Sequence, residues 1–412
     1  MPDFDPDPAG LHQAVDMLLT ALAEPGSPHS LPDVNLGAWA DTGIGGRDAL
    51  QALSRAAMTE VSRLDHPGFF AHMDPPTPWM TWATAMWSAA MNQNLLHTDS
   101  GPAARQVERQ VVDWLAPAFG MRGGHIVPGS TMANLTALWA ARDVAGVRKV
   151  VCSTAAHVSI AKAAALLGLE LVSVPTDDAE RLRLDLLPDD LRDAALVLIA
   201  GTVASGAVDP LDGVEAGWVH VDAAWAGPLR LSSHDALLNG AEQADSVGFS
   251  AHKWLFQPKE SALVLFADPD IAHAAMTYGG SYLAVPNVGL LGSHGGSAGL
   301  ALAASLLAWG RDGVRDLLDS QMTLADDLAD AVLQAGLELW RPPVTGVVNW
   351  RVPGVACEDV QKRLDGAWVS SAIIDGQRWL RSVAANPKAD PQAVVNGVLR
   401  TTSPPGVHRS RG

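Results

Sequence analysis

The amino-acid sequence predicts an α/β protein in which a large domain, built on a mostly parallel sheet, is followed by a small C-terminal α+β domain. Length and composition support this prediction: the 412 residues exceed one simple hydrophobic core, 48% are hydrophobic and 18% are charged. Beyond residue 123, short and almost continuously apolar runs alternate with amphipathic stretches. Such alternation is typical of strands that helices cover on both faces.

The elements follow in chain order. Helices are expected at 11–22, 78–92 and 102–119, with a turn-rich segment at 66–78. Helices at 131–143 and 159–167 then alternate with short buried strands at 149–152, 169–174, 195–201, 218–223, 246–249 and 261–266. A Gly-rich loop at 279–299 precedes two helices, at 300–309 and 314–335, and the stretch 337–399 has a strand-helix-strand pattern.

This pattern divides the chain into three parts. Residues 1–65 form an N-terminal segment that packs on the large domain or on a partner subunit. Residues 66–299 form the large, ligand-binding domain, and residues 300–412 form a long helix and the small C-terminal domain.

Charge and cysteine content narrow the partners and the compartment. The chain has 45 acidic and 28 basic residues, a formal net charge of −17, which repels nucleic-acid phosphates and anionic lipid; we expect neither as a partner. Two cysteines, Cys152 and Cys357, are too few for a disulfide framework and favour a reducing, cytoplasmic compartment. Neither a secretory signal pattern nor a long apolar stretch is present, so no membrane span is expected.

Lys253 differs from the other five lysines of the chain in its position. It follows the predicted strand 246–249, just past the carboxyl edge of the sheet, where open α/β folds bind ligands. Partial desolvation lowers the pKa of a lysine from its ordinary value of about 10.4, and the neutral amine can attack a carbonyl. Taken alone, Lys253 is equally compatible with catalysis and with a structural ion pair.

A carboxylate, Asp222, ends another apolar strand in the run HVDAAW (220–225). Such a group can bind a metal, cap a helix or pair with a cation, but no second carboxylate or histidine pair lies at metal-ligand spacing. If the cation is the ring nitrogen of pyridoxal 5′-phosphate, Asp222 would hold it protonated, so that the ring accepts electrons from the substrate Cα. The small Ala223 and Ala224 leave room for a flat ring, and His220 is expected to be structural.

Two further segments and one strand end carry polar side chains of interest. Ser130 and Thr131 follow Gly129 at a predicted helix start, where N–H groups and hydroxyls suit an anion, although an ordinary helix cap fits equally well. His157, between a strand and a helix, either satisfies local polar groups or stacks on a cofactor ring. Thr202 ends a strand at the same edge and bonds either the cofactor or its own turn.

Together these motifs resemble the group II pyridoxal-phosphate-dependent amino-acid decarboxylases, which have fold type I. The resemblance extends from about residue 66 to 312, and more faintly to 387. HVDAA followed at this distance by an HKW lysine is its most specific part. The matching segments are HPGFF (66–70), NQN (92–94), GSTMANLTALWAARD (129–143), HVSIAKAAALLG (157–168), GTVASGAVDPL (201–211), HVDAAWAG (220–227) and SAHKWL (250–255).

The resemblance implies a role for each matching position. Lys253 would bind pyridoxal phosphate as a Schiff base, and Asp222 would pair with the ring nitrogen. His157 would stack on one face of the ring, with Ala224 against the other. Family members are usually homodimers with the active site at the subunit interface, so we expect a homodimer whose small-molecule substrate is an amino acid. The other cofactor contacts would be Ser130, Thr131, Ser250 and His252 at the phosphate and Thr202 beside the cofactor.

Three positions depart from the family pattern. Ser250 stands where many relatives have Asn, although a hydroxyl can still donate to phosphate. Trp225 stands where many have Tyr, as in several decarboxylases of acidic amino acids. The family's mobile loop often carries a tyrosine that protonates the carbanion; here the stretch 282–299 is short and Gly-rich, with His294 its only titratable side chain after Tyr282. The proton donor is therefore unassigned, with Lys253 and His294 as candidates.

These positions predict pyridoxal-phosphate-dependent decarboxylation of an L-amino acid to the corresponding amine and carbon dioxide. Another fold type I activity, such as transamination or aldehyde-forming decarboxylation, would use the same lysine and aspartate, and an inactive family member is a further alternative. An acidic substrate would need a cation; Arg381 is either that cation or an interdomain arginine. Which amino acid is the substrate does not follow from the sequence.

Overall fold

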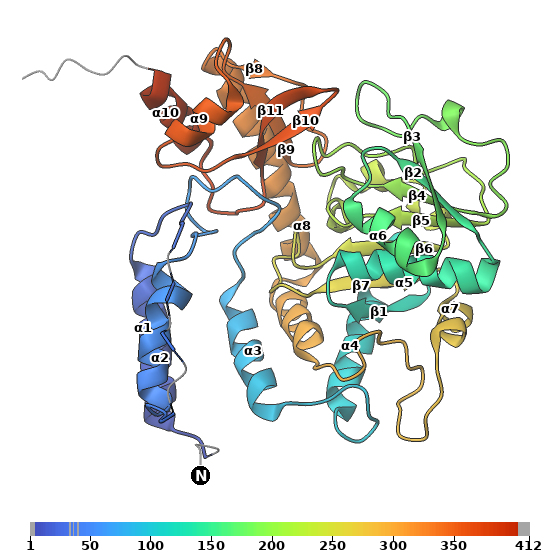
Figure 1. Ribbon diagram of the computed structural model, residues 1–412, viewed down its shortest axis with the longest axis horizontal. Helices are drawn as coiled ribbons and strands as arrows, with labels where there is room; N and C mark the ends of the chain where they lie inside the picture. Colours follow the sequence, from blue (N-terminus) through green and yellow to red (C-terminus); the bar gives the residue numbers. More distant parts are fainter. Residues whose placement is uncertain (1–4, 33, 36, 39–40, 403–412) are drawn as a thin grey trace, which may run out of the picture.

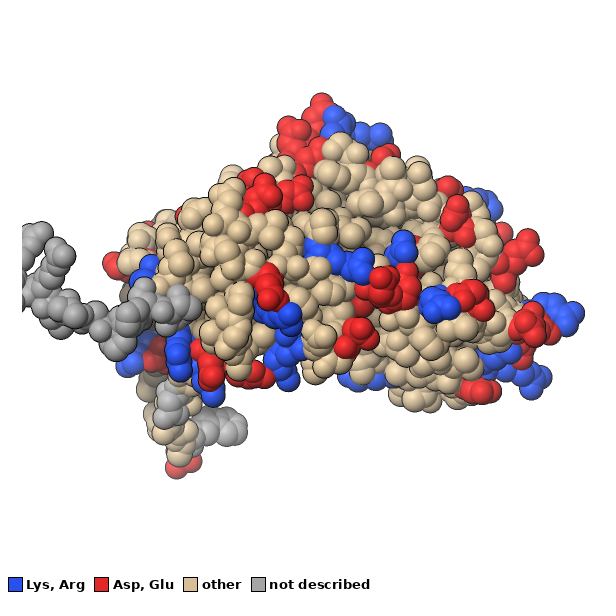
Figure 2. Space-filling view, turned by 90° about the horizontal axis from the view of Figure 1, so that it is seen from above, with Lys and Arg blue, Asp and Glu red and all other residues tan. Residues whose placement is uncertain are grey.

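The computed structural model describes residues 5–32, 34–35, 37–38 and 41–402. A large sheet with helices on both faces lies beside a smaller sheet, and two N-terminal helices stand at one side of the molecule (Figure 1). On the face seen in Figure 2, acidic and basic side chains lie interspersed. None of the described helices has the length and hydropathy that crossing a bilayer requires.

The large sheet consists of β1 (Gly123–Val127), β2 (Lys149–Ser153), β3 (Glu170–Val174), β4 (Ala194–Ile199), β5 (Trp218–Asp222), β6 (Ser246–Ser250) and β7 (Ala262–Phe266). Their order is β1-β7-β6-β5-β4-β2-β3. Five strands, from β6 to β3 in that order, are parallel, and β7 is antiparallel to both neighbours. The mostly parallel sheet is confirmed. The sequence prediction missed β1, because its GGHIV run is not continuously apolar.

Helices cover both faces of this sheet: α4 (Pro102–Leu115), α5 (Ser130–Ala145), α6 (Val158–Leu167), α7 (Pro269–Met276) and α8 (Ser297–Gln334). Successive side chains of one strand enter different cores. Leu196 and Leu198 of β4 belong to the core that includes α4 and α8, whereas Ala195 and Val197 belong to the core that includes α5 and α6. Because both faces are buried, the strands are apolar at nearly every position.

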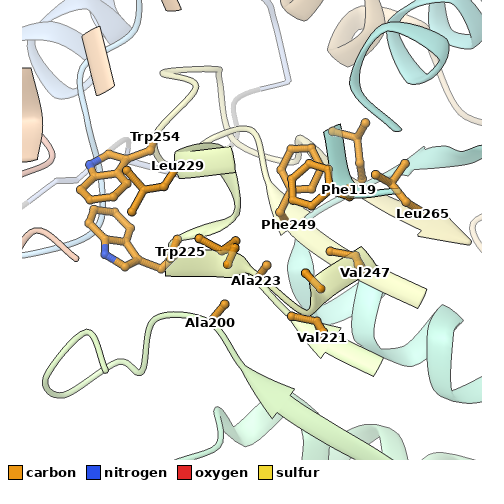
Figure 3. Packing of buried hydrophobic residues seen from close by; sticks show 14 of the residues in the cluster. Phe119, Ala200, Val221, Ala223, Trp225, Leu229, Val247, Phe249, Trp254 and Leu265 are labelled. Carbon is orange, nitrogen blue, oxygen red and sulfur yellow. The ribbon is translucent and has the colours of Figure 1, made fainter. Parts of the chain in front are cut away.

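Two buried tryptophans join the carboxyl edge of the large sheet to the C-terminal part of the chain. The rings of Trp225 and Trp254 lie 4.1 Å apart between centroids, beside Leu229 (Figure 3). Trp225 Nε1 donates to the carbonyl of Thr345 at 2.6 Å, and Trp254 Nε1 donates to the carbonyl of Ala384 at 2.9 Å. The Trp in place of Tyr at position 225, which from sequence could hint at substrate, is thus accounted for by packing.

The smaller sheet is antiparallel, with the order β10-β11-β9-β8, and its elements are β8 (Glu338–Leu339), β9 (Val347–Arg351), β10 (Ser370–Ile374), β11 (Gln377–Val383), α9 (Cys357–Arg363) and α10 (Pro391–Thr402). The long helix α8 leads into it and is interrupted at Gly310, whose φ of 62° is not helical. This interruption separates the two helices that the sequence predicts.

The described residues of the N-terminal part include the α-helices α1 (Pro8–Ala23), α2 (Gly46–Ser54) and α3 (Trp79–Met91), and a π-helical segment (Arg55–Thr59) follows α2. α1 and α2 pack on each other at one side of the molecule, whereas α3 packs on α8 (Figure 1). The large exposed side chains on α3 are apolar, among them Trp79, Trp87 and Met91. The division of the chain at residues 65 and 299 stays a prediction.

Candidate active site

Most of the expected site residues meet in one cavity at the carboxyl edge of the large sheet. The cavity has a volume of about 260 Å³, and its walls come from the ends of β1, β4, β5 and β6 and from the starts of α5 and α6. Met73, from the turn-rich segment 66–78, closes one side. The expected residues on its walls are Ser130, Thr131, His157, Asp222, Ala224, Ser250, His252 and Lys253.

Lys253 lies in a turn directly after β6. Burial lowers the pKa of its ammonium group to about 8, although the carboxylates of Asp222 and Asp74 oppose this shift. No described carboxylate forms an ion pair with Lys253, so the structural alternative left open by the sequence finds no support. A lysine with this pKa has a substantial neutral fraction at physiological pH, as a nucleophilic amine requires.

Asp222 is the last residue of β5 and is only 3% exposed. One carboxylate oxygen accepts from the backbone N–H of Ala224 at 3.1 Å, and the other accepts from Asn134 Nδ2 at 2.8 Å. Both donors are uncharged, and within the described part of the chain no basic side chain forms an ion pair with Asp222. A buried carboxylate without a cation is costly. A protonated ring nitrogen in the cavity would supply the missing charge.

Asn134, one turn into α5, holds Asp222 through a buried hydrogen-bond network. Its two Nδ2 hydrogens go to Asp222 and to Ser159 Oγ, the latter at 2.9 Å. Its Oδ1 therefore accepts from His220 Nε2, at 3.0 Å. His220 Nδ1 then accepts from Ser246 Oγ at 3.0 Å. Each N–H hydrogen and each acceptor atom of the Asn134 amide and the His220 ring therefore has a hydrogen-bond partner.

The same network sets the orientation of His157. His157 is the N-cap of α6, and its Nδ1 accepts from the backbone N–H of Ser159 at 3.2 Å. Because Ser159 Oγ accepts from Asn134, its own hydrogen points to His157 Nδ1, 2.8 Å away. Burial lowers the pKa of His157, which favours a neutral ring. The imidazole is thus held at the cavity wall in a state suited to stacking on an aromatic ring.

Ser130, Ser250 and His252 line the cavity beside the start of α5. The Ser130 and Ser250 hydroxyls are within hydrogen-bonding distance of each other. His252 Nδ1 donates to the carbonyl of Ser261 at 2.8 Å, and burial lowers the pKa of this ring to about 4. Gly129 has a φ of 95°, and the first turn of α5 presents N–H groups that lack intrahelical acceptors. This end of the cavity suits an anion such as a phosphate.

Thr202, which is expected to line the cofactor, lies next to the cavity. It is 1% exposed and is not part of the cavity wall, which includes its neighbours Gly201 and Val203 instead. Its hydroxyl bonds Ser205 Oγ at 2.9 Å and accepts from the Ala207 N–H at 3.1 Å. The reason is local: a buried backbone N–H in this turn needs an acceptor, and Thr202 provides it.

His294 is also absent from this cavity. Its Nδ1 donates to the carbonyl of Gly292 at 2.7 Å, and its ring lines two other cavities on the far side of β1. Of the two expected proton donors, the structure therefore brings only Lys253 to the site within this chain.

Comparison with known proteins shows the family of the chain. Residues 46–335 match the family model described as the pyridoxal-dependent decarboxylase conserved domain. The chain belongs to this decarboxylase family. It is 29% identical to the L-2,4-diaminobutyrate decarboxylase of Rhizobium meliloti strain 1021, over 93% of this chain and 88% of that protein. It is also 29% identical to the aspartate 1-decarboxylase of Aliivibrio fischeri, over 71% of this chain and 65% of that protein.

The fold of the decarboxylase is shared with solved structures. Oryza sativa TDC, solved with PLP and tryptamine, matches with a TM-score of 0.86 at 23% sequence identity, over 97% of this chain and 99% of that one. The protein is thus a pyridoxal-phosphate-dependent amino-acid decarboxylase, a lyase, and the transaminase alternative is not better supported. Bound pyridoxal phosphate supplies an electron sink for the negative charge left at Cα when carbon dioxide departs.

Asn134 belongs to the hydrogen-bond network of the decarboxylase, although the sequence motifs predict no role for it. Asn134→Ala should lower kcat about 10- to 100-fold, with a smaller change in KM, because Asp222 and His157 lose their common support. The pH dependence of the cofactor absorbance should shift as well, which a loss of stability alone would not produce. Asn239→Ala, an exposed asparagine bonded to Arg230, is the matched control. Unchanged kcat and spectrum would contradict this role.

Proposed function

We propose that Lys253 binds pyridoxal phosphate as a Schiff base and that the enzyme converts an L-amino acid to its amine and carbon dioxide. The observation that carries the proposal is that an amine of lowered pKa and a buried carboxylate without a cation face the same cavity. Asp222 would pair with the ring nitrogen, and His157 and Ala224 would lie against the two faces of the ring. The phosphate contacts would be Ser130, Thr131, Ser250 and His252, and Thr202 would support the turn at 201–207.

Arg381 of β11 supports recognition of a carboxylate in the substrate. It is 6% exposed, and Nη1 donates to the Ala71 carbonyl at 3.3 Å and to Ser370 Oγ at 3.1 Å. Its Nε has no partner among the described residues. Burial lowers the pKa of Arg381 to about 10, and its charge also acts on Lys253. We infer that this buried guanidinium, which lacks a carboxylate partner in the described chain, binds a carboxylate of the amino acid.

For the substrate we propose a small amino acid with a short, charged side chain. The compared relatives are named for 2,4-diaminobutyrate and aspartate. An exposed ion pair of Lys259 with Asp74 supports this, because Asp74 also acts electrostatically on Lys253 and Arg381. The Lys259 ammonium would bind an acidic side chain of the substrate, and the Asp74 carboxylate would bind a basic one.

An amino-acid panel tests this function directly. Purified holoenzyme is incubated with aspartate, 2,4-diaminobutyrate, glutamate, phenylalanine and tryptophan, and carbon dioxide, amine and keto acid are quantified. We expect equimolar carbon dioxide and amine, fastest with aspartate or diaminobutyrate. Keto acid without carbon dioxide would overturn decarboxylation for this chain, and preference for an aromatic amino acid would overturn the substrate class alone.

Cofactor uptake should depend on pH through Lys253. Only the neutral amine attacks the cofactor aldehyde, and the pKa of Lys253 is lowered to about 8. The rate at which apo protein acquires the absorbance of lysine-bound cofactor should rise about tenfold per pH unit below that pKa and level off above it. The measurement is stopped-flow absorbance from about pH 6 to about pH 10. A rate that keeps rising toward pH 10 would indicate an ordinary, solvated lysine.

We also propose a homodimer in the cytoplasm. Trp79, Trp87 and Met91 of α3 are each more than half exposed, a patch that monomers rarely leave uncovered. Sedimentation should give twice the chain mass, and Trp87→Asp should shift it toward monomer while Leu333→Asp, an exposed apolar site on α8, does not. A cytoplasmic location is supported by two free, buried cysteines.

A further inference from the structure

Two larger cavities lie on the far side of β1, apart from the cavity that contains Lys253. Their volumes are about 410 and 370 Å³, and they share the wall residues Glu108, His125, Ile126, Gly289 and His294. We call the two together the loop chamber, because residues 284–296 of the Gly-rich loop form part of its walls. Only Pro128 is common to the loop chamber and the Lys253 cavity.

His125 leaves a buried nitrogen without a partner in the shared wall. The residue is 9% exposed, and its Nδ1 bonds His273 Nε2 at 3.2 Å. Its Nε2 has no hydrogen-bond partner among the described residues. Burial lowers the pKa of His125 to about 3, so the ring is neutral and can accept through Nε2 when Nδ1 donates to His273. A buried, unpaired polar atom beside a cavity indicates a missing polar partner.

Glu108, a half-buried residue, adds a carboxyl group to the same wall. Among the described residues, its carboxylate accepts one hydrogen bond, a long one of 3.3 Å from the Ile126 N–H. Burial raises the pKa of Glu108, and among the described residues no basic side chain forms an ion pair with its carboxylate. The ionised carboxylate therefore lacks a paired positive charge, which a cation in the loop chamber would supply.

His294 completes a set of acceptors. Because its Nδ1 donates to the Gly292 carbonyl, the neutral ring presents Nε2 as an acceptor. Carboxylate and imidazole nitrogens together suit a protonated amine, whose hydrogens all donate.

The smaller cavity of the chamber has apolar walls beyond this polar end. They include Val127, Met132, Leu290, Leu291 and Ala301. A ligand that fits both parts has a cationic head and an apolar body. We propose that the loop chamber is a second binding site for a small protonated amine with an apolar body, the chemical class to which the product of amino-acid decarboxylation belongs.

Occupancy of this site would act on the loop. His294 and Gly289 belong to the loop, whose backbone is bonded to the segment after α3: the Leu95 N–H donates to the His294 carbonyl at 2.9 Å, and the Ala284 N–H donates to the Leu96 carbonyl at 3.0 Å. An amine held between the loop and Glu108 would add a contact across this boundary. Binding should therefore reduce hydrogen exchange in residues 284–296.

The test uses holoenzyme and N,N-dimethylphenethylamine as the probe. This tertiary amine is protonated at neutral pH but cannot form a Schiff base, so it does not react with the cofactor. Titration calorimetry should give one saturable site per chain, without change in the cofactor absorbance. Glu108→Gln, which keeps size and an acceptor for Ile126, should weaken binding about tenfold or more. Asp113→Asn, an acid that lines only the larger cavity, should change it less than about twofold.

Three results would contradict an amine site in the loop chamber. Equal affinity of the Glu108→Gln variant and the unaltered enzyme overturns it, and so does an absorbance change that tracks binding, which would place the amine at the cofactor. Phenethyl alcohol, an uncharged analogue, should bind at least about tenfold more weakly. This comparison on the unaltered enzyme decides the matter even if Glu108→Gln fails to fold, since equal binding of alcohol and amine would show a merely apolar pocket.

Discussion

Lys253→Ala should abolish decarboxylation, with a loss of more than about 10⁴-fold in kcat/KM, and should remove the absorbance of lysine-bound cofactor. The expectation rests on the place of Lys253 in the cavity and on the burial that lowers its pKa to about 8. Among the described residues, no other lysine lines this cavity. The measurements are the visible absorbance spectrum of purified protein, the cofactor content after dialysis, and carbon dioxide release.

Lys259→Ala is the matched control for this experiment. Lys259 lies six positions further along the same segment, is about half exposed and pairs with Asp74. Its replacement should leave the absorbance of bound cofactor intact. Cofactor that stays covalently attached in Lys253→Ala would show that the wrong lysine has been assigned, and loss of the absorbance in both variants would point to a general defect in folding.

Asp222→Asn should lower kcat by about 10²-fold or more while the protein still folds and binds cofactor. Two changes cause this loss. The neutral amide no longer compensates a protonated ring nitrogen, so the ring withdraws electrons from Cα less well. The Asn134 Nδ2 donor, 2.8 Å from an Asp222 oxygen, would also face an amide that can offer only one acceptor. Single-turnover rates and the absorbance spectrum measure the effect.

Asp209→Asn is the control that distinguishes a chemical role of Asp222 from the effect of replacing any buried carboxylate. Like Asp222, Asp209 is 3% exposed, and its two oxygens accept from the backbone N–H groups of Leu182 and Ile199, each at 2.7 Å. Asp209 is outside the Lys253 cavity. Asp209→Asn should lower the melting temperature with little change in the kcat of the folded enzyme. If both variants lose kcat equally, the role of Asp222 is structural rather than chemical.

The ends of the central strands were accessible to prediction because their signals are local. An apolar run that stops at Asp222, and another that stops just before Lys253, place both residues at one edge of a parallel sheet by topology alone. The antiparallel β7 and the short β1 were not accessible in the same way. Whether a strand is parallel or antiparallel depends on the strands beside it, which the sequence does not specify. The GGHIV run of β1 has too few apolar residues to predict a strand.

Contacts between elements required the tertiary structure. Asn134 and Asp222 are 88 positions apart and meet only because α5 lies across β5 and β6. The direction of the Thr202 hydroxyl depends on the turn beneath it, and the position of His294 depends on how its loop crosses α4 and β1. Periodicity specifies which face of its own element a side chain occupies, but not what that face meets.

By itself, then, the sequence determined the α/β class and the cofactor, and it predicted that Asp222 and Lys253 lie at strand ends on one edge of the sheet, because motif order and strand ends are properties of the chain. Only the tertiary structure decided how that aspartate is held, that Trp225 packs rather than binds, and that the Gly-rich loop covers a separate chamber containing Glu108 and His125. The physical reason is that hydrogen-bond satisfaction and burial arise between elements, once strand order and helix packing have brought distant residues within a few ångströms.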